Sequence, residues 1–518
     1  MLSRRRFLAF NLTWLLAIVA GGKGTSAEVA YGPVTPFSFE LLRMRALELA
    51  KREYVAQAQP VSDLIGSIDF DKHQQIKFQS NDELWRDSPN RVTVRFFHLH
   101  KYVRSPVRIN VVSDGTAREY LYSKDLFDYG DTGLSSLLPR DLGFAGFRVL
   151  DHEDGGFDWL AFQGASYFRC SGEDNQYGAS ARGVAVDTAS DRAEEFPSFV
   201  EFWLEPAVGD TPAVTIYALL DGPSITGAYR FDATKGDGEV MGVHVELFVR
   251  NDIARLGIAP LTSMYWYGEN ERQKGVDWRP EIHDSDGLEM WTGNDERIFR
   301  PLVNPPSVQV NSFLDKTPKG FGLVQRDRDF DHYQDDGAFY ERRPSIWVEP
   351  KGDWGEGAIQ LVEIPTDDEI YDNIVAYWQP KAPIGKGDVL SFDYRLYWRN
   401  RQPFPSDVVA HVVATRIGRG GVPGQARPED DNLVKFVIDF EGGALATMEP
   451  RYDLTPVITV SDGTASNGYV IKVVGTERWR AVFDFSTQNA KPVNLRCYVR
   501  LDDQTLTETW LYQYFPAS

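Results

Sequence analysis

The chain has few cysteines and an excess of negative charge, and each of these features excludes a class of protein. Only Cys170 and Cys497 occur among 518 residues, so no disulfide framework can be inferred, and both are expected to be small buried hydrophobic residues. The formal net charge is −20. This charge argues against a nucleic-acid partner, because a phosphate-binding surface needs a basic footprint.

Several motifs that would indicate a metal, a nucleotide or a nucleophilic serine are also missing. The sequence contains no CxxC or HExxH motif and no hard-cation loop of the DxDxDG type, so we expect no metal site. It contains no GxGxxG fingerprint and no GxSxG elbow. We therefore expect neither a nucleotide fold nor a serine hydrolase, and no organic cofactor.

A single long apolar run lies at the N-terminus. Arg4, Arg5 and Arg6 precede the apolar residues 8–20, and small residues follow as far as Ala27. This order is typical of a secretory signal, and SRRRFL resembles the twin-arginine export signal of bacteria. A spanning helix needs about 20 apolar residues, which is more than this run supplies. We predict that residues 1–27 are a cleaved signal peptide, that the protein is periplasmic, and that it has no stable membrane insertion after cleavage.

The rest of the chain predicts an all-β protein. One helix is predicted over residues 38–58, where apolar residues recur at helical spacing. After it, short alternating runs such as VMGVHVELFVR and VLSFDYRLYW are separated by turn signals such as GDG and GKGD, which favours sandwich-type sheets. Beyond a Pro-rich stretch near residue 403, six or seven strands in about 110 residues are typical of an immunoglobulin-like sandwich. We predict a large domain over 28–403 and a smaller one over 404–518.

Three segments combine carboxylates with aromatic rings or arginines, and they are the candidate sites. They are residues 264–300, 326–356 and 363–378. Acids among aromatic rings suit sugar hydrolysis, because rings stack on pyranose faces and a pair of carboxylates moves the protons. The crowded acids at 367–372 should raise one another's pKa, which favours a protonated general acid. The alternative for each segment is a structured loop whose rings pack on a sheet and whose acids are solvated.

The sequence resembles the periplasmic glucan biosynthesis proteins G and D of Gram-negative bacteria, and the D type most. The matching stretches cover nearly the whole mature chain, and they include DLGFAGFR, GASYFR, QYGASARGVAVDT, WRPEIHDSDGL, RRPSIWVEPKGDWGEG and LVEIPTDDEIYDNIVAYW. The resemblance implies a large N-terminal β-sandwich similar to galactose mutarotases and a C-terminal immunoglobulin-like domain. It also implies a role in making osmoregulated periplasmic glucans with a β-1,2-linked backbone.

The resemblance also implies roles for individual residues. Asp372 matches the general acid, Asp284 the base side acting through a relay, and Glu369 an acid that supports the proton path. Other positions are expected to contact the glucan, with Tyr340 and Trp347 stacking on glucose units and Arg343 binding hydroxyls. The expected substrate-binding residues are Tyr340, Arg343, Trp347, Trp278 and His283.

These residues lead to one main hypothesis and two rivals. The main hypothesis is a periplasmic enzyme that cleaves or remodels β-1,2-glucan with inversion. The first rival is a transglycosylase that uses the same cleft and excludes water. The second is a glucan-binding scaffold without catalysis, and the inner-membrane glucan synthase is a further expected partner.

Overall fold

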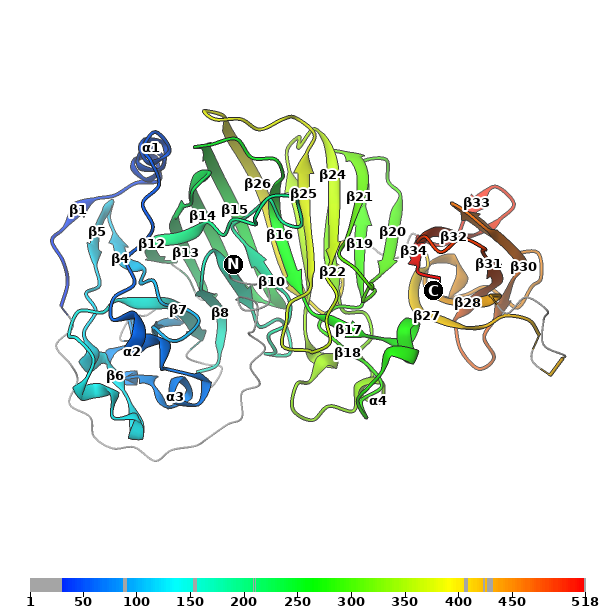
Figure 1. Ribbon diagram of the computed structural model, residues 1–518, viewed down its shortest axis with the longest axis horizontal. Helices are drawn as coiled ribbons and strands as arrows, with labels where there is room; N and C mark the ends of the chain where they lie inside the picture. The colour runs from blue at the N-terminus through cyan, green and yellow to red at the C-terminus, as the bar shows by residue number, and fades with distance from the viewer. Residues whose placement is uncertain are drawn as a thin grey trace.

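The computed structural model describes residues 30–86, 91–151, 156–207, 209, 211–404, 409–422, 424–425 and 432–516. The predicted signal peptide, residues 1–27, lies outside this range. Within it, no helix is both long and apolar enough to cross a membrane. Strands predominate, as the sequence predicts, and they form several sheets rather than a barrel (Figure 1).

Two large sheets form the body of the protein. The first contains, in spatial order, β1 (Thr35–Pro36), β5 (Thr116–Glu119), β4 (Arg108–Ser113), β12 (Ser198–Pro206), β13 (Ala213–Asp221), β14 (Ile225–Gly236), β15 (Gly238–Val249), β26 (Val389–Arg399), β23 (Ser345–Lys351), β22 (Gly320–Val324), β19 (Gly287–Trp291) and β20 (Arg297–Pro301). The second contains β21 (Gln309–Lys316), β24 (Glu356–Glu363), β25 (Ile374–Pro380), β16 (Leu256–Ser263), β10 (Ser180–Arg182), β9 (Tyr167–Cys170), β8 (Asp158–Gln163), β7 (Phe144–Asp151) and β3 (Val92–His98), with β11 (Val184–Val186) beside β16. Most neighbouring strands are antiparallel, which suits the alternating sequence runs.

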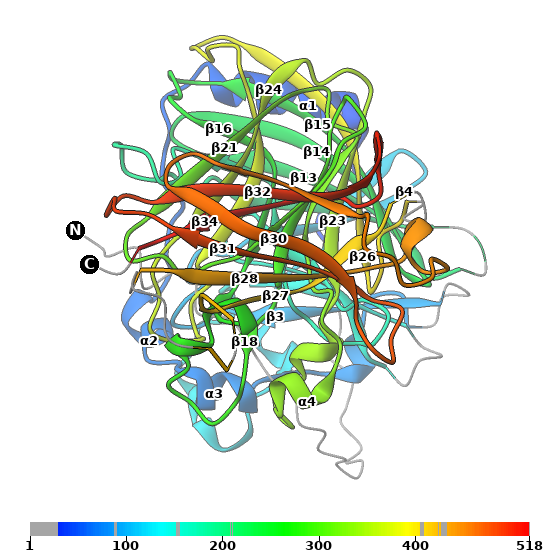
Figure 2. The same cartoon turned by 90° about the vertical axis from the view of Figure 1, so that its right-hand side faces the viewer.

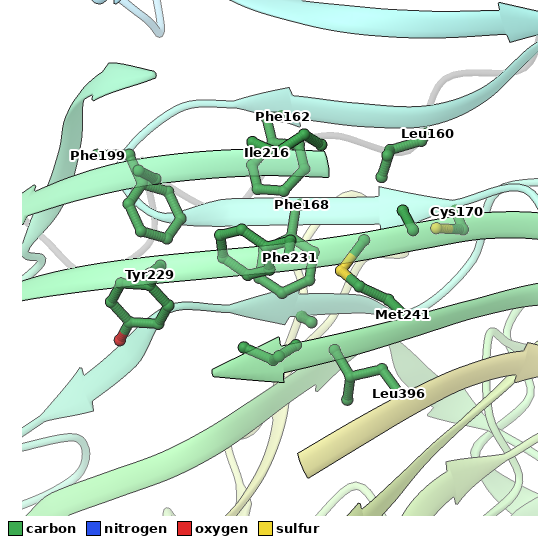
Figure 3. Packing of buried hydrophobic residues seen from close by; sticks show 14 of the residues in the cluster. Leu160, Phe162, Phe168, Cys170, Phe199, Ile216, Tyr229, Phe231, Met241 and Leu396 are labelled. Carbon is green, nitrogen blue, oxygen red and sulfur yellow. The ribbon is translucent and has the colours of Figure 1, made fainter. Parts of the chain in front are cut away.

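The two sheets pack face to face through aromatic side chains. Phe162 of β8 and Phe168 of β9 are stacked with ring centroids 4.9 Å apart, and each lies 5.2 Å from the ring of Phe231 on β14 of the opposite sheet (Figure 3). Along β15, buried and half-buried residues alternate, because successive side chains of a strand point to opposite faces. This packing confirms the predicted sandwich, and Cys170 lies in its core as a buried free cysteine.

The predicted helix is present but shorter than the sequence suggests. Helix α1 spans Phe39–Ala50, begins at the N-cap Ser38 and ends eight residues before the predicted limit at Ala58. Side chains on or next to the first large sheet cap its last turn. Thr226 Oγ1 and Arg250 Nη2 donate hydrogen bonds to the carbonyls of Ala46 and Leu49 at 2.8 Å. Side chains capping these carbonyls end the helix where local spacing alone would extend it.

A second core lies at the C-terminal end of the chain. The four-stranded sheet β27 (His411–Arg419), β28 (Val434–Glu441), β31 (Trp479–Ser486) and β30 (Thr464–Lys472) packs against β29 (Thr455–Val460), β32 (Val493–Leu501) and β34 (Thr509–Tyr514), while β33 (Gln504–Thr505) pairs with β32. Figure 2 looks onto this C-terminal unit. Cys497 is a buried free cysteine in its core.

The C-terminal sheet is continuous with the first large sheet. Strand β34 pairs in parallel with β20, with Ile298 opposite Thr509 and Phe299 opposite Trp510. The second core also includes Phe299 and Trp347 from before residue 403. Because strands and core both cross the predicted boundary, the division at 403/404 stays a prediction.

A group of short elements lies at one end of the large sheets, beneath β22 in Figure 1. It contains the two-stranded sheet of β17 (Tyr265–Tyr267) and β18 (Ile282–His283), helix α4 (Phe330–Tyr333) and the single 3₁₀ turn η7 (Tyr340–Arg342) (Figure 1). Parts of all three sequence segments that combine carboxylates with aromatic rings or arginines meet here.

Candidate active site

Asp372 lines a cavity in the second sheet. The cavity has a volume of about 140 Å³, and its wall includes Asp372, Arg169, Tyr167 and Tyr177. A larger cleft of about 990 Å³ shares Tyr167 with it and includes Tyr371, the neighbour of Asp372. This volume lies within the range of about 300–1,000 Å³ that is usual for ligand-binding clefts.

Met264 and Tyr265, at the start of β17, hold the segments of Asp284 and Asp372 together. The side chain of Asn373 accepts a hydrogen bond from the backbone N–H of Tyr265 at 2.8 Å and donates one to the carbonyl of Tyr265 at 2.9 Å. On the other side, the backbone N–H of Asp284 donates to the carbonyl of Met264 at 2.8 Å. Two residues adjacent in sequence, 264 and 265, therefore anchor both aspartate segments, which are far apart along the chain.

The two aspartates are close enough for their charges to interact. Burial and, to a smaller extent, the negative charge of Asp284 raise the pKa of Asp372 to about 7, although the positive charges of Arg169 and Arg343 act to lower it. A pKa near 7 keeps a large fraction of Asp372 protonated at neutral pH, which suits a general acid. The charge partner is Asp284 rather than the neighbouring acids 367–369, so the cause expected from the sequence is wrong.

Asp284 is enclosed by protein. Its side chain is 1% exposed, and Oδ1 accepts a hydrogen bond from Nη1 of Arg343. Burial raises the pKa of Asp284, and the positive charge of Arg343 opposes this increase. The other oxygen, Oδ2, is buried without a hydrogen-bond partner among the described residues. Asp284 therefore cannot touch a substrate directly in this conformation.

Glu369 belongs to a network next to this pair. Arg279 donates hydrogen bonds to both carboxylate oxygens of Glu369, at 2.8 and 3.1 Å. The hydroxyl of Tyr340 donates a third hydrogen bond to Glu369 at 2.6 Å. The guanidinium of Arg343 lies 4.2 Å from the centroid of the Tyr340 ring. Tyr340 and Arg343 thus form a chain of contacts from Glu369 to Asp284.

Four of the expected substrate-binding residues cannot contact a sugar in this conformation. His283 is buried, and its ring nitrogens lie 3.0 Å from Gln325 and 3.0 Å from Glu281. The Tyr340 ring is 1% exposed and packs against Arg343. Arg343 is itself buried and engaged by Asp284.

Trp347 is the fourth of these residues. It is 2% exposed and belongs to the second core, where its ring lies 5.4 Å from that of Phe404. Trp278 differs from all four, because it is 73% exposed next to Arg279 of the Glu369 network. Of the five expected contacts, only Trp278 presents an open ring to solvent.

Sequence reasoning missed three cavity residues. Arg169 influences the pKa of both aspartates, and its guanidinium lies 4.7 Å from the ring centroid of Tyr177, whose hydroxyl donates to Asp158 at 3.0 Å. Tyr167 lines both the cavity and the larger cleft. They lie in GASYFR and QYGASARGVAVDT, stretches that were used only for the resemblance. The sequence signal that could have identified these three residues is the placement of arginine and tyrosine within short strands and turns.

The glycine of the second stretch has a steric reason. A Cβ at Gly178 would lie 2.9 Å from the Cβ of Arg343. Real Cβ atoms almost never approach so closely, so glycine allows the backbone of this stretch to pack against Arg343.

Comparison with known proteins now decides the family. The family model described as "Periplasmic glucan biosynthesis protein, MdoG" matches residues 37–514, a range that contains every site residue described above. The chain belongs to the periplasmic glucan biosynthesis protein family. This membership gives it a role in periplasmic glucan biosynthesis and confirms the resemblance found in the sequence.

Curated members of the family are similar over nearly their whole length. Glucans biosynthesis protein D 2 of Ralstonia nicotianae is 49% identical over 503 residues, which cover 95% of this chain and 93% of the relative. Glucans biosynthesis protein D of Xanthomonas oryzae pv. oryzae is 47% identical over 94% of this chain and 92% of its own. The protein of the same name from Stenotrophomonas maltophilia is 46% identical, with coverages of 98% and 95%.

Proposed function

We propose that this family member is an exported periplasmic glycoside hydrolase that cleaves β-1,2-glucan with inversion. The observation that carries the proposal is a pair of aspartates whose charges interact: Asp372, which lines a cavity, and Asp284, which is buried. Glycoside hydrolysis with inversion needs one carboxyl group that gives a proton to the leaving oxygen and one that takes a proton from water. The β-1,2 linkage and the export by a twin-arginine signal come from the resemblance and the N-terminal sequence.

Asp372 is the proposed general acid. Its raised pKa, about 7, leaves a proton available for the leaving oxygen at neutral pH. After the proton is transferred, the aspartate is stabilised by the positive charges of Arg169 and Arg343, which lower its pKa. The same side chain can thus hold its proton before bond cleavage and carry a negative charge afterwards.

Asp284 is the proposed base, and its burial favours inversion. A retaining enzyme needs a carboxylate that attacks the anomeric carbon directly. Asp284 is 1% exposed and bonded to Arg343, so it cannot reach that carbon. It can take a proton only through an intervening hydroxyl or water, which leaves water as the attacking group.

Product analysis tests this proposal. Linear β-1,2-glucan is incubated with the mature protein, with Asp372→Asn and with Asp367→Asn, a control on the exposed part of the same loop. We expect shorter linear chains from the wild type and the control. NMR should show that these products first form with the inverted anomeric configuration. We expect a rate lowered by about two to four orders of magnitude in Asp372→Asn, with glucan binding retained.

The same assay separates the two rivals. Cyclic or lengthened products by mass spectrometry would identify a transglycosylase, in which a sugar hydroxyl takes the place of water. Glucan binding without any products, at every protein concentration, would identify a scaffold. An Asp372→Asn variant that cleaves at the wild-type rate would remove Asp372 from the mechanism.

A further inference from the structure

A small acidic cavity lies apart from the cavity of Asp372. Its volume is about 30 Å³, and its lining includes Glu269, Glu281, Asp286 and Asp327. Residues 412–415 of the C-terminal unit also line it. A volume of 10–15 Å³ is enough for one water molecule, so this cavity has room for a single ion.

Three potential ligands converge beside this cavity. Glu281, Asp327 and His332 each place one oxygen or nitrogen atom so that all three atoms lie within 4.8 Å of one another. Glu281 immediately precedes β18, Asp327 follows β22, and His332 lies on α4. The side chain of His332 is 44% exposed, so the cluster has access to solvent.

A fourth carboxylate leaves an oxygen without a partner. Oδ2 of Asp286 accepts hydrogen bonds from the backbone N–H groups of Arg326 and Asp327, at 2.7 and 2.9 Å. Oδ1 of Asp286 has almost no accessible surface and no hydrogen-bond partner among the described residues. A buried carboxylate oxygen without a partner is unfavourable, and a bound cation would satisfy it.

The nearby arginines are already shared with other acids. Arg326 lines the cavity, but its guanidinium is paired with Glu289 at 2.9 Å and Glu508 at 2.5 Å. Arg416 pairs with Glu269 at 3.2 Å and also with Asp439 at 2.9 Å. These positive charges are therefore divided between the cavity and acids outside it. His283, which also lines the cavity, and His332 are each bonded to one acid of the cluster.

We propose that Glu281, Asp327 and His332 bind one divalent transition-metal ion such as Zn²⁺ or Mn²⁺, beside the cavity whose wall contains Asp286. Two carboxylates and one imidazole form a ligand set that suits these ions, whereas Ca²⁺ and Mg²⁺ prefer oxygen ligands alone. The ligands come from three separate segments rather than from one loop. A search for a DxDxDG pattern therefore gives no sign of them.

The ion would join two parts of the site scaffold. Glu281 lies three residues before Asp284, while His332 lies on the helix that precedes Tyr340 and Arg343. An ion bound by both residues would hold the start of β18 against α4. Its role would be to hold these segments in place, without contact with the substrate.

Metal binding to the full mature chain tests the inference. The protein is stripped with a chelator and titrated calorimetrically with Zn²⁺ and Mn²⁺, and bound metal is counted by mass spectrometry after dialysis. We expect one ion per chain, a higher melting temperature with the ion, and weak or absent binding of Mg²⁺. His332→Ala and Glu281→Gln should each weaken binding at least tenfold, since even outer partners of a metal ligand change affinity by about 10–100-fold.

A matched control separates this site from general surface binding. His244 of β15 is also a partly exposed histidine, 34% exposed, and its Nδ1 lies 2.8 Å from Asp393 on the neighbouring strand β26. His244→Ala should bind the ion as the wild type does. The inference is overturned if the wild type shows no saturable binding of either ion, or if His244→Ala and His332→Ala lose affinity equally. It is also overturned if Ca²⁺ or Mg²⁺ binds in preference.

Discussion

Replacing the proposed general acid should make the protein more stable. The pKa of Asp372 is raised by burial and by Asp284 to about 7, whereas an aspartate in an unfolded chain has a pKa of about 3.9. Between these values the folded protein binds more protons than the unfolded chain, so the free energy of unfolding falls as pH rises. Above pH 7 the loss reaches about 4 kcal/mol, since each pKa unit corresponds to about 1.4 kcal/mol. This figure is an upper bound, because Asp372 keeps some solvent exposure.

Asp372→Asn removes this pH-dependent penalty, because an amide does not ionise. The variant should match the wild type at pH 4, exceed its stability by about 2 kcal/mol at pH 5.5, and exceed it by up to about 4 kcal/mol above pH 7. Urea unfolding followed by tryptophan fluorescence at these three pH values measures the difference. Asp367→Asn, on the exposed part of the same loop, should show no such dependence on pH. A difference between Asp372→Asn and wild type that stays constant with pH, or a less stable variant, would refute the reasoning.

Three further results follow from the site geometry. The kcat/KM of the wild type should fall about tenfold per pH unit above pH 7. Arg169→Gln should shift this fall to higher pH, because Arg169 lowers the pKa of Asp372. A kcat/KM profile that is not shifted in the variant would contradict this. Gly178→Ala should lower turnover at least tenfold by displacing the site arginine, whereas Gly418→Ala, where a Cβ meets nothing within 4 Å, should not. Trp278→Ala should raise KM with little change in kcat, while Trp347→Ala should lower stability by about 3–5 kcal/mol in urea unfolding.

The fold class was predictable because strand alternation is local. The segment 389–398 reads as a strand in the sequence and is one in β26. Strand β27 is hard to recognise in the sequence, since it runs directly into the Gly- and Pro-rich stretch that begins at residue 416. The helix end at Ala50 could not be predicted either, because the groups that close it, Thr226 and Arg250, lie about 200 residues away.

The site was predictable only in part. The sequence and its resemblance pointed to Asp284, Glu369 and Asp372, and the structure places all three in one connected region. Which aromatic rings face solvent could not be read from composition. Trp278 and Trp347 are the same residue type in adjacent candidate segments, yet one is on an open loop and the other fills a core. Burial of a single ring is decided by the tertiary structure, which periodicity in a loop does not encode.

The pairing of β34 with β20 has a consequence for how the chain is completed. Strand β34 supplies the neighbour of a strand that is synthesised some 200 residues earlier. Until residues 509–514 have been synthesised, β20 remains an open sheet edge, and the hydrophobic side chains of Phe299 and Trp347 lack the core residues that cover them. A truncated product would therefore expose an unpaired sheet edge and uncovered hydrophobic side chains. Cellular proteases and chaperones recognise such features.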